Sequence, residues 1–390
     1  MTIKVYIALL SLAVCAFAIG TTEFVIIGLL QTVANDLSIS VTKAGTLISG
    51  YAIALAVGTP IVTALTGRIP KKGYLIILML VFTLGNIISA VAGSYEVLML
   101  SRVITAVSHG VFFAVASILA TEIVPEGKKG TAISIMFTGL TVATIVGVPL
   151  GTFIGQNLGW RSTFGAVAIL GVIGLIVNIF AVEKFKTQGN PPTLKDVGLL
   201  IKNYRILLAL LMTALGFGAT FVLFTYLAPI LEEISGYSSE NISFLLLIYG
   251  VAVAIGNIIG GKMANNHPVK ALRLVFVLEG IVLLLQMWFL PSKSLSIVGL
   301  LLLGLVAFMM SPGAQAYILT LAEKLVPSAK DIASALNVSA FNVGIAVGSS
   351  LGGVAVVYFT YLDTAWIGAI MAAGASLLAV INNKLDQRMN

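Results

Sequence analysis

The sequence predicts an all-α integral membrane protein whose twelve transmembrane helices form two parallel repeats of six. Three observations support this prediction: long apolar runs, an uneven distribution of basic residues, and an internal sequence repeat. Hydrophobic residues make up 59% of the 390 residues and charged residues only 9%, against roughly 25% charged residues in soluble domains. So little charge could not cover the surface of a soluble protein, so most of the surface must face lipid.

Apolar runs of about 20 residues, the length that crosses a bilayer, recur along the whole chain. We expect the first six spans at 5–30, 45–65, 73–92, 97–120, 131–154 and 163–182. We expect the second six at 206–230, 243–264, 272–290, 295–321, 332–359 and 364–384. The first run is too long for the apolar region of a signal peptide, so it is expected to be a span.

The basic residues follow the order of the spans. With the N-terminus in the cytoplasm, Lys43, Arg161 and Lys293 fall outside and Arg102 falls inside the fourth span. The other 18 of the 22 basic residues then fall on the cytoplasmic side. This asymmetry obeys the positive-inside rule. It predicts a multi-pass protein of the cytoplasmic membrane with both termini in the cytoplasm.

A polar stretch divides the chain near its middle. Residues 183–205 include Pro191-Pro192 and five basic residues, and we expect them to form a cytoplasmic linker. The domains are then an N-terminal six-helix bundle, 1–182, and a C-terminal six-helix bundle, 206–390.

The two halves repeat in sequence. The loop 63–72 aligns with 261–270 at an offset of 198 positions, and the segment 147–151 aligns with 348–352 at an offset of 201. Six spans in each half give both halves the same orientation. Such parallel repeats commonly bind substrate near the bilayer midplane, between the halves.

Several kinds of chemistry are excluded. The single cysteine, Cys15, allows no intrachain disulfide. His109 and His267 are isolated in the sequence, so no metal site and no cofactor are expected. There is no G-x-x-x-x-G-K-[ST] motif for ATP. The segment Gly348-Ser349-Ser350-Leu351-Gly352 matches a nucleophile elbow, but it lies inside an apolar run. We therefore do not expect an enzyme.

Several motifs carry a resemblance to a known family. The loop after the second span resembles the G-x-L-A-D-R-x-G-R-K motif of the major facilitator superfamily, with Thr63, Gly67 and Pro70 replacing three motif residues. The fifth span and Gly159-Trp160-Arg161 after it are similar to the signature of the drug:proton antiporter branch. Thr21-Thr22-Glu23 with His109-Gly110 resembles the sugar, purine and drug efflux subgroup. The residues that match the loop motif are Leu65, Arg68, Lys71 and Lys72.

The resemblance implies a proton-coupled antiporter that exports small neutral or amphipathic compounds by alternating access. Drugs, sugars and nucleosides are the expected substrates, and multidrug resistance is one expected consequence. The partners would be the substrate, protons and the lipid bilayer, with no nucleic acid, and the protein would act as a monomer. Two alternatives stay open. One is an uncoupled facilitator or importer of a small polar solute, and the other is a membrane receptor that does not transport.

Three ionisable residues lie inside spans of the N-terminal half. A charged side chain at the centre of a span costs about 2.5–3.5 kcal/mol on insertion scales, so Glu23 and Arg102 require a reason. His109 follows Arg102 by seven residues, which places both on one helix face. We expect Glu23, Arg102 and His109 to couple proton movement. The alternative is a structural salt bridge between Glu23 and Arg102.

Polar residues in other spans are candidates for substrate binding, although each could equally bond to a neighbouring helix. They are Tyr51, His109, Tyr226, Asn257, Gln315, Asn337 and Asn342. Small residues in the fifth and eleventh spans permit close helix packing, and we expect this packing to seal the halves against each other during gating. They are Gly139, Gly147, Pro149, Gly151, Gly155, Gly348 and Gly352. Glu279, in the ninth span, is expected to have a structural role, either reaching the interface or pairing with Gln286.

Overall fold

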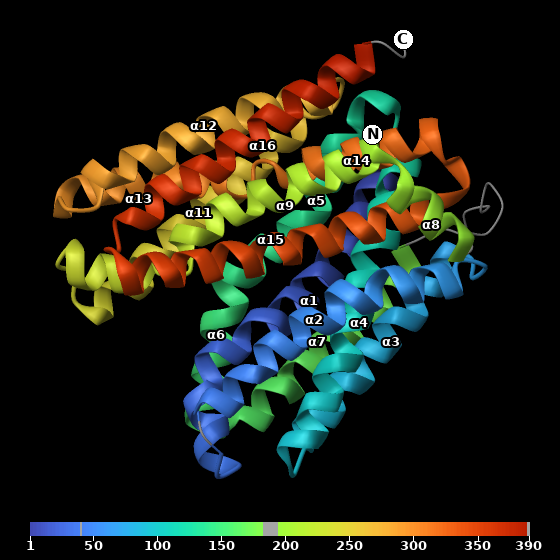
Figure 1. The fold of residues 1–390 in the computed structure, drawn as a ribbon. Helices are drawn as coiled ribbons and strands as arrows, with labels where there is room; N and C mark the ends of the chain where they lie inside the picture. Colours follow the sequence, from blue (N-terminus) through green and yellow to red (C-terminus); the bar gives the residue numbers. More distant parts are fainter. Residues whose placement is uncertain (40, 182–193, 388–390) are drawn as a thin grey trace. The chain divides into compact units, whose positions relative to one another are not determined.

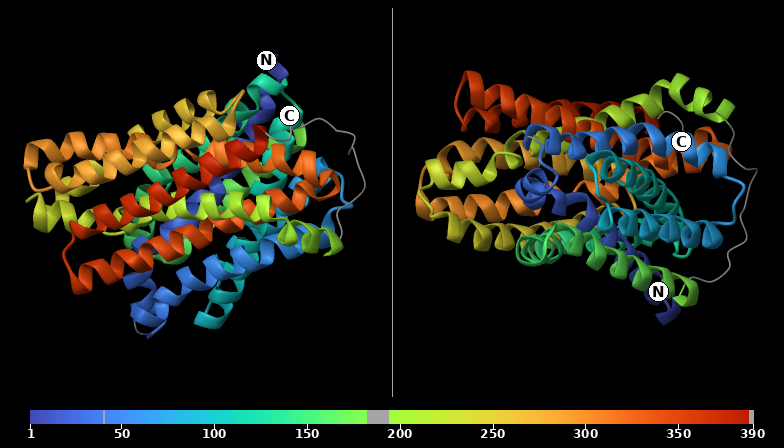
Figure 2. Two further views of the ribbon diagram at one scale, coloured as in Figure 1. Left: turned by 45° about the horizontal axis from the view of Figure 1, so that its top comes forward. Right: turned by 90° about the horizontal axis from the view of Figure 1, so that it is seen from below.

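The computed structural model describes residues 1–39, 41–181 and 194–387, and all regular structure in these ranges is helical. The chain divides into two compact units (Figures 1 and 2). Unit 1 comprises Met1–Val124, Ile135–Gly198 and Val326–Ser339, and unit 2 comprises Pro125–Ser134, Leu199–Leu325 and Ala340–Asn390. The predicted linker, 183–205, lies partly outside the described residues. Its described part contains a short helix that the sequence analysis did not predict.

Unit 1 is built mainly from the first seven helices, of which α3 packs against both α4 and α7. The tight turn between α6 and α7 requires Gly159, whose φ of 84° favours glycine. Ser94 caps α4 by accepting a hydrogen bond from the Val97 amide. The helices are α1 (Ile3–Asp36), α2 (Val41–Thr66), α3 (Lys71–Ala90), α4 (Tyr95–Glu122), α5 (Lys129–Val142), α6 (Val148–Leu158) and α7 (Trp160–Ala181).

Unit 2 is built mainly from the later helices, of which α16 packs against both α9 and α12 (Figure 1). The Asn203 side chain caps α9 by accepting from the amides of Arg205 and Ile206. The helices are α8 (Leu194–Lys202), α9 (Tyr204–Phe224), α10 (Leu227–Pro229), α11 (Ser239–Met263), α12 (Pro268–Phe289), α13 (Lys293–Ala307), α14 (Ser311–Leu325), α15 (Lys330–Tyr358) and α16 (Asp363–Gln387).

Eleven helical segments of the described chain are long and apolar enough to cross a membrane, and the remaining expected span falls on α12. Three expected spans are interrupted. The seventh, 206–230, breaks after Phe224 and continues as α10 and a π-helical turn at Ile230–Ile234. The fifth is α5, a π-helical turn at Ala143–Gly147, and α6. Pro149 removes a donor from the helix ladder, and the π turn accommodates this loss. The tenth span is broken into α13 and α14 between Ala307 and Ser311.

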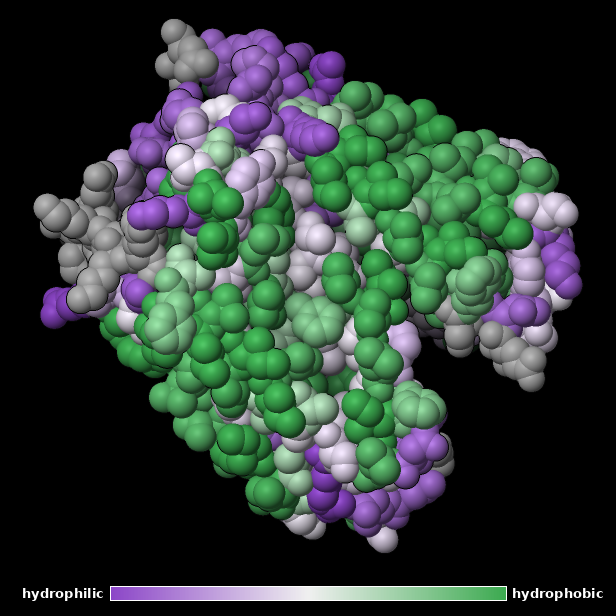
Figure 3. All heavy atoms as spheres, turned by 180° about the vertical axis from the view of Figure 1, so that it is seen from behind, coloured by the Kyte–Doolittle hydropathy of each residue, from purple (hydrophilic) through white to green (hydrophobic). Residues whose placement is uncertain are grey.

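Apolar side chains face outward along the helices of each unit. Figure 3 shows hydrophobic residues over the middle of the helices and hydrophilic residues gathered near the helix ends. This distribution suits a lipid environment, because lipid replaces water around the middle of each helix. Examples of exposed apolar residues are Ile53, Val57, Ile61 and Leu65 on α2, and Leu274, Val277, Leu278 and Ile281 on α12.

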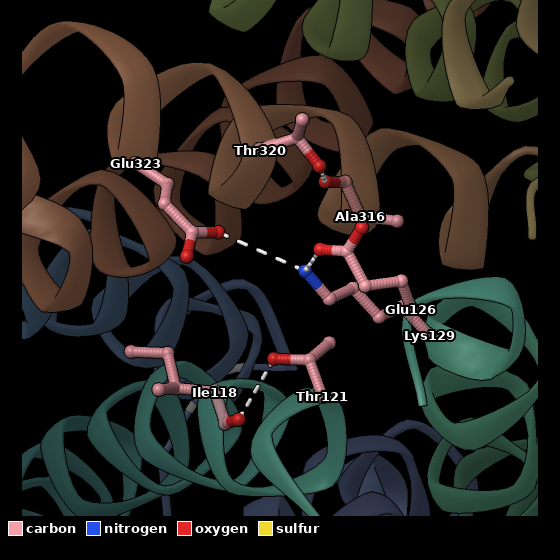
Figure 4. A network of polar contacts seen from close by, with 7 residues as sticks. All are labelled: Ile118, Thr121, Glu126, Lys129, Ala316, Thr320 and Glu323. Carbon is pink, nitrogen blue, oxygen red and sulfur yellow. Dashed lines mark hydrogen bonds and ion pairs between the residues drawn. The ribbon is translucent and has the colours of Figure 1, made fainter. Parts of the chain in front are cut away.

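Charged side chains pair near the helix ends. In unit 2, Lys129 Nζ lies 3.0 Å from Glu126 Oε1 and 3.8 Å from Glu323 Oε2 (Figure 4). These pairs are partly exposed, so each contributes little to stability. They do show that the polar ends of α5 and α14 belong to the same charged surface.

Candidate functional site

Three helices of unit 1 bring together the ionisable residues predicted from the sequence. Glu23 lies on α1, Tyr51 on α2, and Arg102 and His109 on α4. Arg102 and His109 both contact Tyr51. They therefore share one face of α4, as their seven-residue spacing predicts.

Arg102 is a buried cation held by backbone carbonyls and an aromatic ring. The residue is only 1% exposed. Nη1 donates to the carbonyl of Thr22 at 2.6 Å and Nη2 to the carbonyl of Glu23 at 3.4 Å. The guanidinium carbon lies 4.1 Å from the centroid of the Tyr51 ring, which is within range of a cation–π interaction. The dipoles of the two carbonyl groups and the Tyr51 ring thus compensate the positive charge of Arg102.

Glu23 sits beside Arg102 without pairing to it directly. The residue is partly exposed, and among the described residues its carboxylate makes no hydrogen bond or ion pair. Arg102 still acts on it electrostatically. The predicted proximity is therefore present, whereas the salt bridge considered as an alternative is not formed, because the guanidinium points at the backbone carbonyls of the same helical turn.

A line of aromatic contacts continues from Arg102 along α4. The hydroxyl of Tyr51 lies 2.9 Å from His109 Nδ1. The His109 ring centroid is 5.1 Å from that of Phe113, which stacks on Phe137 at 5.2 Å. These contacts therefore combine one hydrogen-bonded imidazole with a buried aromatic cluster.

The sequence patterns assigned no site role to Thr22, Asn86, Phe113 or Phe137. Thr22 donates to Asn86 Oδ1 at 2.6 Å and so ties α1 to α3 directly beside Glu23. Phe113 contacts His109. Asn86 could have been found as a polar residue in an apolar span. Phe113 carried no such signal, because aromatic residues are common in spans.

Of the other substrate-binding candidates, Asn337 belongs to unit 1, whereas Tyr226, Asn257, Gln315 and Asn342 belong to unit 2. Asn257 on α11 exchanges hydrogen bonds with Ser134, at 3.0 Å to its carbonyl and 2.8 Å from its hydroxyl. The hydroxyl of Tyr226 donates to the carbonyl of Ser349 at 3.3 Å. These bonds show both residues joining helices. Gln315 and Asn337 are fully buried, and Asn342 is partly buried.

The predicted packing residues permit close approach within each unit. A Cβ on Gly139 would lie 1.9 Å from the carbonyl oxygen of Ala13 on α1, and one on Gly348 would lie 2.3 Å from the carbonyl oxygen of Gly218 on α9. The nearest neighbours of Gly147, Gly151, Gly155 and Gly352 likewise include α1 or α9 residues of the same unit. We expected this packing between the halves. It lies inside each unit, because these glycine faces turn toward α1 or α9.

The three basic residues of the loop motif lie in different environments. Lys71 is buried and pairs with Glu122 at the end of α4, at 2.7 Å. Lys72 donates to the carbonyl of Ile179 at 2.8 Å. Arg68 is exposed. Asp331, at the start of α15, interacts electrostatically with both Lys71 and Glu122.

Glu279 corrects one prediction. It is only 1% exposed, so it does not reach the lipid–water interface. It does not pair with Gln286 either, because the amide nitrogen of Gln286 donates to the carbonyls of Val282 and Gly299, both at 3.1 Å. Instead, Thr220 on α9 donates to Glu279 Oε1 at 2.5 Å.

A polar pocket of about 430 Å³ lies at one end of unit 1, lined by the turn after α1 and the start of α4. Arg161 Nη1 donates to Asp36 Oδ2 at 2.7 Å, and the Trp160 indole donates to the same oxygen at 3.1 Å. The hydrogen bond from Arg161 holds the pKa of Asp36 below its usual value. In the described chain, no group of three His, Cys, Asp or Glu residues is arranged to hold a metal ion.

Two helical units with ionisable residues buried in long apolar helices define a membrane transporter in which polar chemistry is enclosed by spans. Residues 12–329 match the model of the Major Facilitator Superfamily, and the chain belongs to this family. The predicted fold class is confirmed, and the chain is a transporter rather than an enzyme.

The relatives cover nearly the whole chain. YtbD of Bacillus subtilis (strain 168), an uncharacterized MFS-type transporter, is 48% identical over 381 residues, 98% of this chain and 96% of that protein. The inner membrane transport protein YdhP of Escherichia coli (strain K12) is 38% identical over 381 residues, 97% of this chain and 96% of that protein. These bacterial relatives support a multi-pass protein of the cell membrane.

Solved structures show the same fold at low sequence identity. The fucose:proton symporter FucP of E. coli matches with a TM-score of 0.79 and 15% identity, covering 98% of each chain. The proton:xylose symporter XylE matches with a TM-score of 0.76 and 16% identity, covering 96% of this chain and 94% of that chain. The fold is therefore that of the major facilitator superfamily, with about twelve spanning helices.

Proposed function

We propose that this protein is a proton-coupled secondary active exporter, an antiporter of small neutral or amphipathic compounds such as drugs, sugars or nucleosides. One observation carries the proposal. The partly exposed carboxylate of Glu23 lies beside the buried Arg102 guanidinium, yet the two form no ion pair. A carboxylate that is not locked to a cation can accept and release protons.

The coupling cycle rests on the charge of Glu23. While the site faces outward, Glu23 takes a proton as the substrate leaves. Neutralising the carboxylate lowers the cost of enclosing it away from water, so the loaded protein can change its facing. Facing the cytoplasm, Glu23 releases the proton, and the restored negative charge again attracts Arg102. His109 and Tyr51 share a hydrogen bond, so the two side chains reorient together when the charge of Glu23 changes.

The chemistry around Tyr51 supports the substrate class. The imidazole of His109 and the hydroxyl of Tyr51 offer hydrogen bonds, whereas Phe113 and Phe137 offer apolar aromatic surface. This combination suits a compound with one polar and one apolar part. Further substrate contacts are proposed from Tyr226, Asn257, Gln315, Asn337 and Asn342.

We also propose that both termini face the cytoplasm and that the protein acts as a monomer. The distribution of basic residues supports the orientation, with Lys43 and Arg161 on the outer side. The domains proposed are the two six-helix bundles at 1–182 and 206–390, joined by the linker at 183–205.

A second candidate is substrate import with protons. FucP and XylE are proton symporters, so the same fold supports coupling in that direction. The similarity of the fifth span and its flank to antiporter signatures favours export. The direction of coupled proton movement separates the two candidates.

The test is a screen of toxic compounds in a pump-deficient bacterial host. Cells would carry the wild-type protein, Glu23→Gln, or the control Glu96→Gln, which removes an exposed acid at the start of α4. We expect wild type and the control to raise growth-inhibiting concentrations for some compounds and to lower their accumulation, and Glu23→Gln to lose both effects. Equal protection by Glu23→Gln at equal expression would refute the proposal.

Everted membrane vesicles then give the direction. Respiration acidifies their interior, and a fluorescent dye reports that acidity. Adding the exported compound should release protons from wild-type vesicles and not from Glu23→Gln vesicles. Alkalinisation of the medium when a solute is added to right-side-out vesicles would instead establish symport.

A further inference from the structure

Glu279 is a second buried carboxyl that the proposed coupling mechanism does not use. It lies in the middle of α12, which packs against α16 in unit 2 (Figure 1). Its single hydrogen bond comes from the hydroxyl of Thr220 to Oε1, at 2.5 Å. The other oxygen, Oε2, has no hydrogen-bond partner among the described residues. No ion pair reaches Glu279 in the part of the chain that the structure describes.

Among the described residues, no cation forms an ion pair with Glu279 or acts on it electrostatically. Tyr249 on α11 is the titratable group that interacts with it electrostatically, and a phenol is neutral at physiological pH. Arg273, six residues earlier on α12, is exposed. The other charged residues whose side chains are described on the helices packed against α12 lie toward helix ends. They are Arg205 on α9, Lys262 on α11, Lys270 on α12, Lys293 on α13, Glu323 and Lys324 on α14, and Asp363, Lys384 and Asp386 on α16.

This environment suits the neutral acid better than the carboxylate. An ionised carboxylate buried without a counter-charge has lost its hydration and gained only one hydroxyl donor, which is unfavourable. The protonated acid has no net charge and keeps the bond from Thr220. The burial and the missing counter-charge therefore favour the protonated acid in the described conformation.

The internal repeat indicates that an acid is not needed for packing. Thr220 follows Thr22 by 198 positions, the offset of the repeated loop. Thr22 makes the corresponding bond in unit 1, where it donates to the amide oxygen of Asn86 on α3. A neutral amide thus joins the first and third spans of one half, whereas a carboxyl joins those of the other. The carboxyl adds the capacity to bind and release a proton.

We propose that Glu279 is a second proton-binding site, located in unit 2 and separate from the site at Glu23. The acid releases its proton from the carboxyl O–H to water when water reaches it, which leaves the carboxylate and a hydronium ion, and the reverse step restores the acid. The hydroxyl of Tyr249 and the amide oxygen of Gln286 also lack partners among the described residues, so both can bond to entering water. This inference goes beyond the proposed function and does not rest on it.

Infrared difference spectroscopy of the purified protein in proteoliposomes tests the proposal. A step from acidic to alkaline pH should remove the C=O stretching intensity of protonated carboxylic acids. We expect one component to be absent from Glu279→Gln but fully present in Glu23→Gln. The two proposals are thus tested independently, because an outcome that concerns the Glu23 component alone would count only against the proposed coupling. An identical acid C=O change in wild type and Glu279→Gln would overturn the proposal.

A second variant keeps the test decisive if Glu279→Gln does not fold. Thr220→Val removes the hydroxyl that favours the carboxylate, so the Glu279 component should persist to a more alkaline pH than in wild type. The control is Thr320→Val on α14, whose hydroxyl bonds to the carbonyl of Ala316 (Figure 4). It should leave the titration unchanged. An unshifted component in Thr220→Val would overturn the proposal.

Discussion

Ser38 adopts a backbone conformation that normally belongs to glycine. Its φ is 53°, the one positive value at a non-glycine residue in the described chain. It ends α1 in a Schellman-type turn, in which the Ile39 amide donates to the Ala34 carbonyl at 3.0 Å and the Ser38 amide to the Asn35 carbonyl at 3.3 Å. The side chain of Ser38 therefore costs free energy at this position.

We expect Ser38→Gly to raise the free energy of unfolding by roughly 1 kcal/mol, because it removes the steric conflict of Cβ in the left-handed region. The measurement is the thermal unfolding midpoint in detergent. Ser292→Gly is the matched control, since Ser292 precedes a helix at a φ of −102° and gains no such relief. A midpoint for Ser38→Gly at or below that of the control would contradict the explanation.

Asp36 supplies a pH-dependent contribution to the same end of unit 1. Because Arg161 lowers its pKa in the folded state, its contribution to stability is fully present above the unfolded pKa of about 3.9. That contribution is lost as the pH falls through the lower folded pKa. Both side chains are partly exposed, so the contribution should stay below about 1 kcal/mol.

We therefore expect Asp36→Asn to lower the unfolding midpoint at neutral pH and to converge with wild type as the pH falls below about 4. Unfolding curves in detergent over this pH range provide the measurement. A difference between the two proteins that stays constant down to the lowest pH would show that the carboxylate charge is not responsible.

Single residues of the candidate site could be identified from the sequence, but their contacts could not. A charge inside an apolar span is rare, so Glu23 and Arg102 were evident. Their arrangement depends on the rotation of α1 against α4, which no residue pattern encodes. That rotation turns Arg102 toward the carbonyls of Thr22 and Glu23 and leaves the Glu23 carboxylate unpaired.

At the scale of helices, close contact with α1 depends on glycine. A Cβ added at Gly139 would lie 1.9 Å from the carbonyl oxygen of Ala13, and backbone atoms cannot move aside as a side chain can. We expect Gly139→Ala to destabilise the protein by about 1–3 kcal/mol, which is typical of overpacking.

Gly165→Ala provides the control for this substitution. Gly165 lies within α7 and has nothing within 4 Å of its added Cβ. Thermal unfolding of both variants should show a clear loss of stability only for Gly139→Ala. If the two substitutions have the same effect, helix propensity rather than close approach explains the glycine.

Helix boundaries were predictable where sequence punctuates the chain and not elsewhere. Pro149 predicts an irregularity in the fifth span, and the structure has a π-helical turn just before it, at Ala143–Gly147. The break between α13 and α14 directly precedes Ser311-Pro312-Gly313, a signal that a span prediction based on hydropathy alone does not use. The short helix α8 lies in a polar stretch that composition describes as a linker.

At the scale of the whole molecule, the internal sequence repeat accounts for most of what could be predicted about the fold. Corresponding glycines pack on corresponding helices, Gly147 and Gly151 on α1 and Gly348 and Gly352 on α9. The repeat and the spans therefore predicted the fold class. They could not predict which polar residues lie together, because that depends on packing between helices distant in sequence.

The orientation in the membrane is testable by cysteine labelling. Cys15 is the single native cysteine and is buried, so a Cys15→Ser background provides a clean start. In intact cells, an impermeant maleimide should label Lys43→Cys. It should label Lys270→Cys only after the membrane is opened, because the basic loops are expected to face the cytoplasm. The opposite labelling pattern would reverse the proposed orientation.

The central claim, that Glu23 couples proton movement to transport, is tested most directly in proteoliposomes with a compound that the protein exports. Two rates are measured for wild type and Glu23→Gln: uphill transport driven by a pH gradient, and exchange of labelled for unlabelled compound without a gradient. We predict that Glu23→Gln loses gradient-driven transport and keeps exchange, because the carrier still changes its facing with substrate bound. Gradient-driven transport that survives unchanged in Glu23→Gln would contradict the claim.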